Sequence, residues 1–201
     1  MSHVPELCGE RVRVRELRAR DHQVYERLFT HSMLTQYLGV DRMDPRRAQD
    51  AFAQCLAQPH IQPRRKYTFA VCAADDDTMA GTIGLLVEDY GSNAMLTGLV
   101  MLPDAPALGG GFEAGRLVMA YAFGPLGLHR VWAGHRADHT RMRGVMLAAG
   151  LKPEATLRHL FHTQEAWHDV TTYSALAPEW TPQAGVAEQA VLNAHKALQT
   201  A

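Results

Sequence analysis

Apolar and polar positions alternate along some stretches of this chain and recur every three to four residues along others. Alternation or short apolar runs predict strands at 11–17, 67–73, 79–87, 95–102, 128–135, 152–163 and 167–176. Helical spacing predicts helices after Asp21, from Pro45 to Pro59, over 112–123 and after Asp138, with a shorter helical turn at 32–38.

The order of these elements predicts the architecture. One strand and the first helices precede three strands, and a helix, a strand, a helix and two closing strands follow. Short turns indicate an antiparallel meander, whereas the helix after 95–102 returns the chain as a parallel crossover. We therefore expect an α/β (α+β) mixed sheet with helices on both faces. One domain is expected over residues 1–180, followed by a C-terminal helical tail over 181–201.

A glycine turn joins the apolar run 95–102 to the helix 112–123. It contains the consecutive glycines Gly109, Gly110 and Gly111. Glycine lets the backbone approach a ligand closely, and a helix N-terminus presents free N–H groups and partial positive charge. The turn is therefore interpreted as a phosphate or pyrophosphate site, and the alternative is a flexible loop.

The composition is that of an ordinary globular protein, and its charge balance limits the kinds of partner to expect. Hydrophobic residues make up 47% of the chain and charged residues 20%, and 20 basic against 21 acidic residues leave a net charge of −1. This balance argues against nucleic-acid and membrane partners. The basic clusters at 11–20 and 63–66 are interpreted as the solvated face of a strand. Three widely spaced cysteines and the lack of a leader pattern indicate a cytoplasmic protein with reduced thiols.

Several segments together are similar to one known family. They are 9–17 at the start, 121–123 and 126–131 in the middle, and Glu154, 157–158, 169–173 and 179–180 toward the end. In the order and spacing of these segments the chain resembles the GNAT superfamily of acetyl-CoA-dependent N-acetyltransferases, particularly the branch of the ribosomal-protein N-terminal acetyltransferases. The resemblance implies a GNAT fold, in which a mostly antiparallel central sheet contains a splayed pair of parallel strands.

The resemblance also implies acetyl-CoA as the acyl donor and no metal. The glycine turn would hold the pyrophosphate, and pantetheine would lie between the strands 95–102 and 128–135. The implied cofactor-binding residues are Leu99, Val100, Met101, Leu102, Leu108, Gly109, Gly110, Gly111, Phe112, Glu113, Ala114, His139 and Met142. The reaction would be direct attack of a primary amine, from a protein N-terminus or a small metabolite, on the thioester. A homodimer is left open as the assembly.

The chain departs from the family pattern mainly at side chains. Pro106 replaces the Arg or Gln that usually opens the glycine loop, and Leu96 replaces a Glu on the strand before it. His139 and Met142 stand where the family has Asn and Ser, and Ala166 replaces a hairpin glycine. Two alternatives to the enzyme therefore stay open: a CoA-binding or interaction module without catalysis, and a GNAT scaffold that no longer uses CoA.

Four side chains are candidates for the chemistry of transfer. Glu88 and Asp89 follow the 79–87 strand, and either carboxylate can act as the base, directly or through water. His139, at the start of a helix, can donate to the thiolate or to a CoA phosphate. The Tyr173 phenol can reach the thiol site. The alternatives are structural: a solvated strand end, a water-facing helix start and core packing, respectively.

Other polar and aromatic residues are interpreted as structural. Glu113 complements the dipole of its helix, Tyr121 belongs to the core face, and His135 closes its strand. His159 and His162 lie three residues apart in a strand and therefore on opposite faces, which argues against a metal site.

Overall fold

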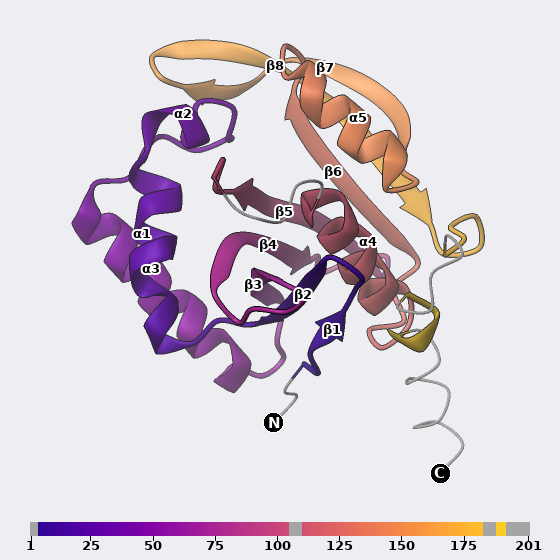
Figure 1. Ribbon diagram of the computed structural model, residues 1–201. Helices are drawn as coiled ribbons and strands as arrows, with labels where there is room; N and C mark the ends of the chain where they lie inside the picture. Colours follow the sequence, from indigo (N-terminus) through magenta and orange to yellow (C-terminus); the bar gives the residue numbers. More distant parts are fainter. Residues whose placement is uncertain (1–3, 105–109, 183–187, 192–201) are drawn as a thin grey trace.

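The computed structural model describes residues 4–104, 110–182 and 188–191, which form one mixed sheet with helices around it (Figure 1). The strands lie in the order β1-β2-β3-β4-β5-β6-β8-β7, and every neighbouring pair is antiparallel except β5 and β6. The strands are β1 (Leu7–Cys8), β2 (Val12–Glu16), β3 (Lys66–Ala73), β4 (Met79–Val87), β5 (Asn93–Met101), β6 (Arg130–Arg136), β7 (Lys152–Thr163) and β8 (Ala166–Leu176). The predicted mixed, mostly antiparallel sheet is confirmed.

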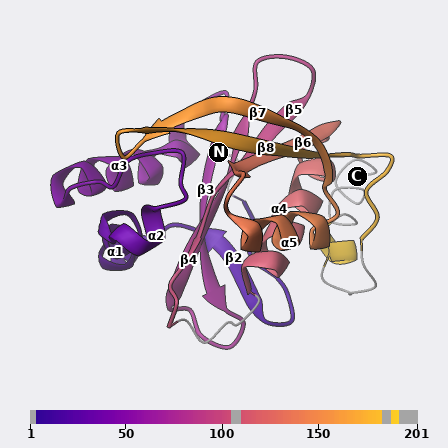
Figure 2. The same ribbon diagram turned by 90° about the horizontal axis from the view of Figure 1, so that it is seen from above.

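The helices cover both faces of the sheet, as predicted (Figure 2). They are α1 (His22–Thr30), α2 (Ser32–Thr35), α3 (Pro45–Ala57), α4 (Gly110–Phe123) and α5 (Thr140–Ala148), with short 3-10 turns at Ala19–Asp21 and Gln58–His60. One core cluster joins α1 and α3 to the sheet through Leu28 and Phe52, and another joins α4 and α5 to it through Leu117 and Met146. In the described segments, no helix is long and apolar enough to cross a membrane.

The start of α3 follows the sequence signals. The Asp44 side chain accepts a hydrogen bond from the backbone N–H of Arg47 at 2.9 Å, and Pro45 occupies the first helical position. The predicted end of helix α5 is also confirmed. Gly150 directly follows the C-cap residue of this helix and has a φ of 88°.

Two other helix starts differ from the prediction. Helix α4 already begins at Gly110, so Gly110 and Gly111 form its first turn and are not a loop before it. The N-cap of α5 is His139 and not Asp138. Asp138 does not cap because its carboxylate accepts from the Arg136 guanidinium instead, at 3.1 and 2.6 Å.

Two arginines of the basic clusters are buried, which corrects the interpretation as a solvated strand face for these two residues only. The other basic residues of the clusters are exposed or half-buried: Arg11, Arg13, Arg18, Arg20, Arg65 and Lys66. Arg15 is 1% exposed, and its guanidinium donates to both carboxylate oxygens of Asp21 at 2.7 and 3.0 Å. Arg64 is also buried and donates to both carboxylate oxygens of Glu16 at 2.6 and 2.9 Å. Both arginines lie inside because a carboxylate accompanies each of them.

Strand β7 is the outer strand at one edge of the sheet and carries a bulge. Its pairing with β8 shifts register between Leu157 and Phe161. Within the shift, His159 adopts a φ of 50°, and its backbone N–H donates to the Asp169 carboxylate at 2.9 Å. The bulge therefore interrupts the regular edge of β7 near its middle.

Part of the predicted tail is held against α4. Residues 188–191 are helical, whereas 183–187 and 192–201 lie outside the described residues. Arg116 of α4 is 2% exposed and donates to both carboxylate oxygens of Glu188 at 2.5 and 2.8 Å. Arg116 also donates to the backbone oxygen of Thr181 at 3.0 Å. A buried ion pair thus joins the tail to the helix that begins at the glycine turn.

Candidate active site

The parallel strands β5 and β6 open into a fork. They pair only through residues 93–95 and 130–132, although β5 continues to Met101 and β6 to Arg136. Gly98 has a φ of 62°, and the register of β5 against β4 shifts beside it. This irregularity coincides with the divergence from β6, and the splayed parallel pair implied by the resemblance is present.

The fork leaves one edge of β5 without a strand partner. Residues 96–101 pair with β4 along their other edge, so the backbone groups that face β6 have no ladder among the described residues. The side chains of Leu99 and Met101 pack toward α4, and those of Val100 and Leu102 pack toward α1 and α3. An extended ligand that contains amides can add to such an edge as a further strand.

Helix α4 starts close behind the end of β5. Pro106, Leu108 and Gly109 fall outside the described residues, and Gly110 and Gly111 form the first helical turn. A Cβ atom on Gly111 would lie 3.4 Å from Met101 Cγ and 3.5 Å from Leu99 Cδ1, so the first turn of α4 lies within ordinary van der Waals reach of the strand. The first N–H groups of a helix have no helical acceptor, which suits a phosphate at this place.

The Glu113 side chain is engaged away from the fork. Its carboxylate accepts the backbone N–H groups of residues 10–12 at 2.6, 2.9 and 3.1 Å and so ties the β1–β2 turn to α4. Phe112 is partly buried against the core, and Ala114 is fully buried. Residues 112–114 can therefore reach a ligand in the fork through their backbone more readily than through their side chains.

Four aromatic rings form a row, here called the aromatic row, that runs from β8 past the end of β6 to the segment after α2. Tyr173 stacks on His135 with the ring centres 5.2 Å apart, and His135 meets His139 edge-on at 6.2 Å. His139 in turn stacks flat on Tyr37, with centres 4.1 Å apart. Tyr173 and His135 are buried, whereas His139 and Tyr37 are half-buried. The row thus leads from the core toward the surface.

The tip of the β7–β8 hairpin lies over the segment that carries Tyr37 (Figure 1). The backbone N–H of Gln164 donates to Asp41 Oδ1 at 2.8 Å. Arg136 donates to the backbone oxygen of Gln36 at 2.8 Å, and its guanidinium carbon lies 5.3 Å from the centre of the Tyr37 ring. These contacts hold the outer end of the aromatic row against β6.

Glu88 and Asp89 lie at the other end of β5 from the glycine turn, where the fork is closed. Glu88 Oε1 accepts from the Trp132 indole N–H at 3.1 Å, and Trp132 belongs to the last pair that joins β6 to β5. Asp89 is largely exposed and forms an ion pair with Arg65. The structure therefore brings together His139 and Tyr173 of the predicted candidates, and it places the two carboxylates apart from them.

Met142 and His139 occupy the start of α5. Met142 is partly buried against the core on the α4 side and offers no polar group. Burial, with a smaller contribution from His135, lowers the pKa of His139 below its ordinary value of 6.5. The His139 ring is therefore neutral at pH 7 and is expected to meet a ligand as a neutral imidazole.

A pH dependence of stability is expected from His139. Since folding holds the pKa of this ring below 6.5, the unfolded chain binds more protons than the folded chain between the folded-state pKa and 6.5. The contribution of His139 to the free energy of unfolding should be complete above 6.5 and fall as the pH drops through that window. Urea unfolding at a series of pH values, in wild type and His139→Gln, measures it. Identical pH slopes in the two proteins would contradict the expectation.

The histidines of the β7–β8 hairpin pack against a tryptophan and backbone. The ring centres of His159 and His162 lie 6.4 and 4.9 Å from that of Trp167. His168 Nε2 lies 3.1 Å from the Thr163 carbonyl oxygen. Within residues 4–104, 110–182 and 188–191, no group of three or more His, Cys, Asp or Glu side chains is placed to hold a metal ion.

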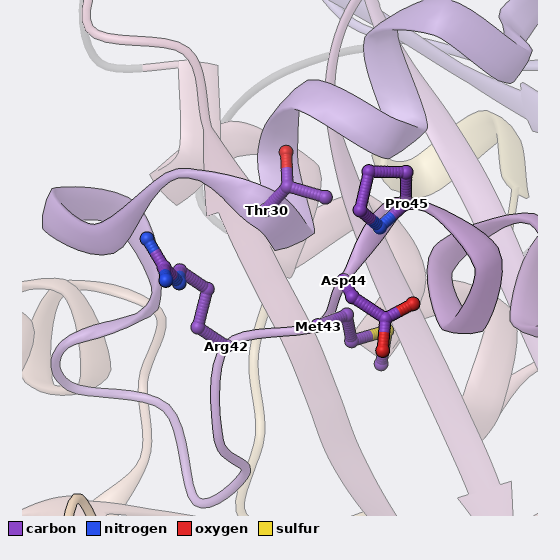
Figure 3. A pocket seen from close by; sticks show the side chains of 5 residues that line it. All are labelled: Thr30, Arg42, Met43, Asp44 and Pro45. Atoms are coloured by element: carbon purple, nitrogen blue, oxygen red, sulfur yellow. The ribbon is translucent and has the colours of Figure 1, made fainter.

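Two surface hollows lie away from the fork. One, of about 440 Å³, lies between the end of α1 and the start of α3 (Figure 3) and is lined by Thr30, Arg42, Met43, Asp44 and Pro45. Its Arg42 and Asp44 side chains point to different sides and do not converge on one ligand. The other, of about 530 Å³, is lined by residues 157–159 and Asp169 at the β7 bulge. Neither contains a residue of the aromatic row.

Sequence reasoning missed Tyr37 and Arg136 and gave His135 only a structural role. Tyr37 lies 102 positions from its stacking partner His139 along the chain, and no local pattern marks such a pair. One available signal was the spacing of His135 and His139, four residues apart across the junction of a predicted strand and a predicted helix.

Comparison with known proteins defines the class. Residues 11–152 match the acetyltransferase (GNAT) domain family. A curated relative, the uncharacterized N-acetyltransferase YoaA of Bacillus subtilis (strain 168), is 24% identical over 174 residues, which cover 87% of this chain and 98% of the relative. With the fork in place, this match over most of the chain shows that the protein belongs to the GNAT family of acetyltransferases.

Two solved structures illustrate the shared fold. Mycobacterium smegmatis RimJ, in complex with CoA-disulfide, has a TM-score of 0.73 and 20% identity, covering 91% of this chain and 88% of RimJ. The spermidine N-acetyltransferase of Vibrio cholerae, in complex with CoA and spermine, has a TM-score of 0.72 and 17% identity, covering 84% of this chain and 96% of that enzyme. The chain is a GNAT-type N-acetyltransferase, and both of these enzymes share its fold.

Proposed function

We propose that the protein transfers an acyl group, in the first place acetyl, from acyl-CoA to a primary amine by direct attack of the amine on the thioester. The observation that carries this proposal is the fork, with a free edge of β5 that leads to the first turn of α4. A free strand edge suits the two amides of pantetheine, and the helix N-terminus suits the pyrophosphate.

The cofactor-binding residues of the proposal fit these two roles. The backbone of Leu99, Val100, Met101 and Leu102 lines the fork. The phosphates are assigned to the stretch from Leu108 to Ala114, of which the structure describes Gly110 to Ala114 as the start of α4. A Cβ on Gly111 would touch Met101 and Leu99 in ordinary contact, so a glycine here leaves the backbone uncovered where it is proposed to approach the ligand. His139 and Met142, at the start of α5, complete the proposed set of cofactor-binding residues, which includes no metal ligand.

The acceptor is proposed to be a primary amine. RimJ and the spermidine N-acetyltransferase share the fold, and the second is named for a polyamine. A peptide amino terminus and a small polyamine are therefore the acceptors to test first. We place the protein in the cytoplasm, with the transferase domain over 1–180 and the tail over 181–201. A homodimer is the proposed assembly.

A second function, CoA binding without catalysis, is favoured by the two positions where a carboxylate base is expected, residues 96 and 88. Leu96 is buried at 7% exposure, and Glu88 is hydrogen-bonded to Trp132 at the closed end of the fork. A chain without a carboxylate base beside the thioester can bind CoA and yet transfer slowly. The alternative is therefore a CoA-binding module without turnover.

Calorimetric titration with acetyl-CoA and CoA tests the proposal. Wild type should bind with micromolar affinity, and Gly111→Trp should weaken binding by about tenfold or more because its side chain projects at Met101 and Leu99 in the fork. Gly144→Trp is the matched control, since a Cβ on Gly144 meets no heavy atom within 4 Å. Absence of binding in wild type would overturn the proposal.

An amine panel then separates transfer from binding alone. It contains alanine- and serine-initiated peptides, spermidine and a free amino acid, each with acetyl-CoA, and it follows release of the CoA thiol. Turnover with any of them supports the transferase. Tight CoA binding without turnover on the whole panel supports the binding module.

A further inference from the structure

His135 is the buried polar group of the site that the proposed function has not used. The residue is 6% exposed and lies near the end of β6, inside the aromatic row. Its Nδ1 lies 2.7 Å from the backbone carbonyl oxygen of Arg136. Because a carbonyl oxygen only accepts hydrogen bonds, Nδ1 carries the hydrogen and the neutral ring keeps its lone pair on Nε2.

The Nε2 atom of His135 is buried without a hydrogen-bond partner among the residues that the structure describes. Tyr173 covers the face of the ring, and His139 stands edge-on to it, but neither supplies a donor to Nε2. A buried acceptor without a donor is costly and rare in native structures. The arrangement is explained if a donor arrives with a ligand.

We propose that His135 is the proton acceptor of the transfer reaction and that its Nε2 takes a proton from the acceptor ammonium group, directly or through one water. The inference rests on the proposed N-acyltransferase function. It assigns the general base to an imidazole of β6, in place of Glu88 or Asp89.

The position of His135 in the fork suits this role. It lies three residues beyond Trp132, the last β6 residue paired with β5, and therefore about 10 Å along the fork. An acyl-CoA whose phosphates bind at the α4 turn runs inward along β5, which brings its thioester toward β6. The amine that attacks the thioester then meets the side of the fork that carries His135.

The chemistry balances with this single base. The ammonium group gives one proton to Nε2 and becomes a neutral amine. The amine nitrogen then forms a bond to the thioester carbon, the C–S bond breaks, and its electron pair leaves with the sulfur. The imidazolium returns its proton to the thiolate. The nitrogen still carries two protons after the attack, and one of them leaves to solvent to give the neutral amide. The products are the amide, the CoA thiol and one proton.

None of the described groups around the ring is placed to take the accepted proton from His135. Tyr173 faces it from β8 and His139 from α5, and Arg136 follows it on its own strand. The Arg136 charge is compensated by Asp138, with 2.6 Å between Nη2 and Oδ2. No carboxylate among the described residues contacts Nε2, so the imidazole is the base and does not relay to an acid.

Two substitutions of His135 test the assignment. In His135→Asn the amide can still donate to the Arg136 carbonyl in place of Nδ1, but the acceptor at Nε2 is gone. In His135→Gln the amide oxygen can accept a hydrogen bond near the Nε2 position, but it takes no proton at neutral pH. Both variants should lose about a hundredfold in kcat, keep wild-type affinity for CoA, and lose the acid-side limb of the pH–rate profile.

His129→Gln is the matched control, because it makes the same change at an exposed histidine just before β6. It should keep wild-type kcat and pH profile. Recovery of kcat in His135→Gln would show that Nε2 only positions the amine, and that result overturns the base. An unchanged pH profile in both His135 variants overturns it as well.

Nitrogen-15 spectra of histidine-labelled wild type show which ring nitrogen of His135 carries hydrogen, and they need no acceptor amine. The free protein at neutral pH should show His135 with hydrogen on Nδ1 and a bare Nε2. A ring with hydrogen on Nε2, or a charged ring, overturns the proposal even if no amine in the panel turns over. Failure of the proposed function itself is distinguishable, because it appears as absence of CoA binding in wild type.

Discussion

Replacement of Asp21 by alanine is expected to lower the free energy of unfolding by about 3–5 kcal/mol. Asp21 is 3% exposed and accepts two hydrogen bonds from Arg15, which is 1% exposed. Without the Asp21 carboxylate, the Arg15 guanidinium stays buried and its positive charge is only partly compensated. Asp77, its other partner at 2.7 Å, cannot take over fully because Arg13, Arg18 and Arg20 contact the same carboxylate.

Urea unfolding measures the effect of Asp21→Ala, with Arg20→Ala as the control. Arg20 is largely exposed, and loss of its ion pair with Asp77 should cost less than about 1 kcal/mol. The double variant Arg15→Met/Asp21→Leu removes both charges together and should recover most of the stability. A cost for Asp21→Ala no greater than that for Arg20→Ala would contradict a buried, compensated charge.

Replacement of Glu188 by alanine is expected to lower the free energy of unfolding by about 3–5 kcal/mol, because it also leaves a buried arginine, Arg116 of α4, without its carboxylate. Arg116 is 2% exposed, and both carboxylate oxygens of Glu188 accept from it. Among the described residues, it also contacts the neutral carbonyl oxygens of Ala149 and Thr181, at 3.3 and 3.0 Å, and the face of the Trp180 ring, whose centre lies 5.0 Å from the guanidinium carbon. These neutral groups orient the guanidinium but do not replace the negative charge of the carboxylate.

Urea unfolding and limited proteolysis both report on Glu188→Ala. The variant should be cleaved sooner than wild type beyond Trp180, because its tail is no longer tied to α4. Glu179→Ala is the control, since Glu179 pairs with the exposed Lys152 at 2.7 Å and should cost less than about 1 kcal/mol. Equal costs in Glu179→Ala and Glu188→Ala would show that burial of the Arg116 pair does not matter.

Local patterns predicted the elements of this fold, because their causes are local. Asp44 followed by Pro45 begins α3, and Gly150 follows α5, through contacts that span only a few residues. The helix predicted after Asp138 was offset by one residue, since the Asp138 carboxylate is held by Arg136. The splayed strand pair came from the resemblance and not from any period in the sequence.

The candidate site was less accessible to sequence reasoning because its partners are distant along the chain. The candidate His139 was found, but Tyr37, on which it stacks, was not. His135 reads as a strand end in sequence, and only the structure shows that one nitrogen is bonded and the other is not. The same limit explains Arg15, whose alternation with apolar neighbours is equally compatible with a solvated and a buried ion-paired face.

The bulge in β7 bears on how the protein avoids aggregation. A flat outer strand of 12 residues with the exposed apolar side chains of Leu157 and Leu160 is a template for edge-to-edge addition of other chains. His159 interrupts the template at its centre, since its left-handed backbone turns the edge out of register. Relaxation of this bulge to a regular strand would remove the protection.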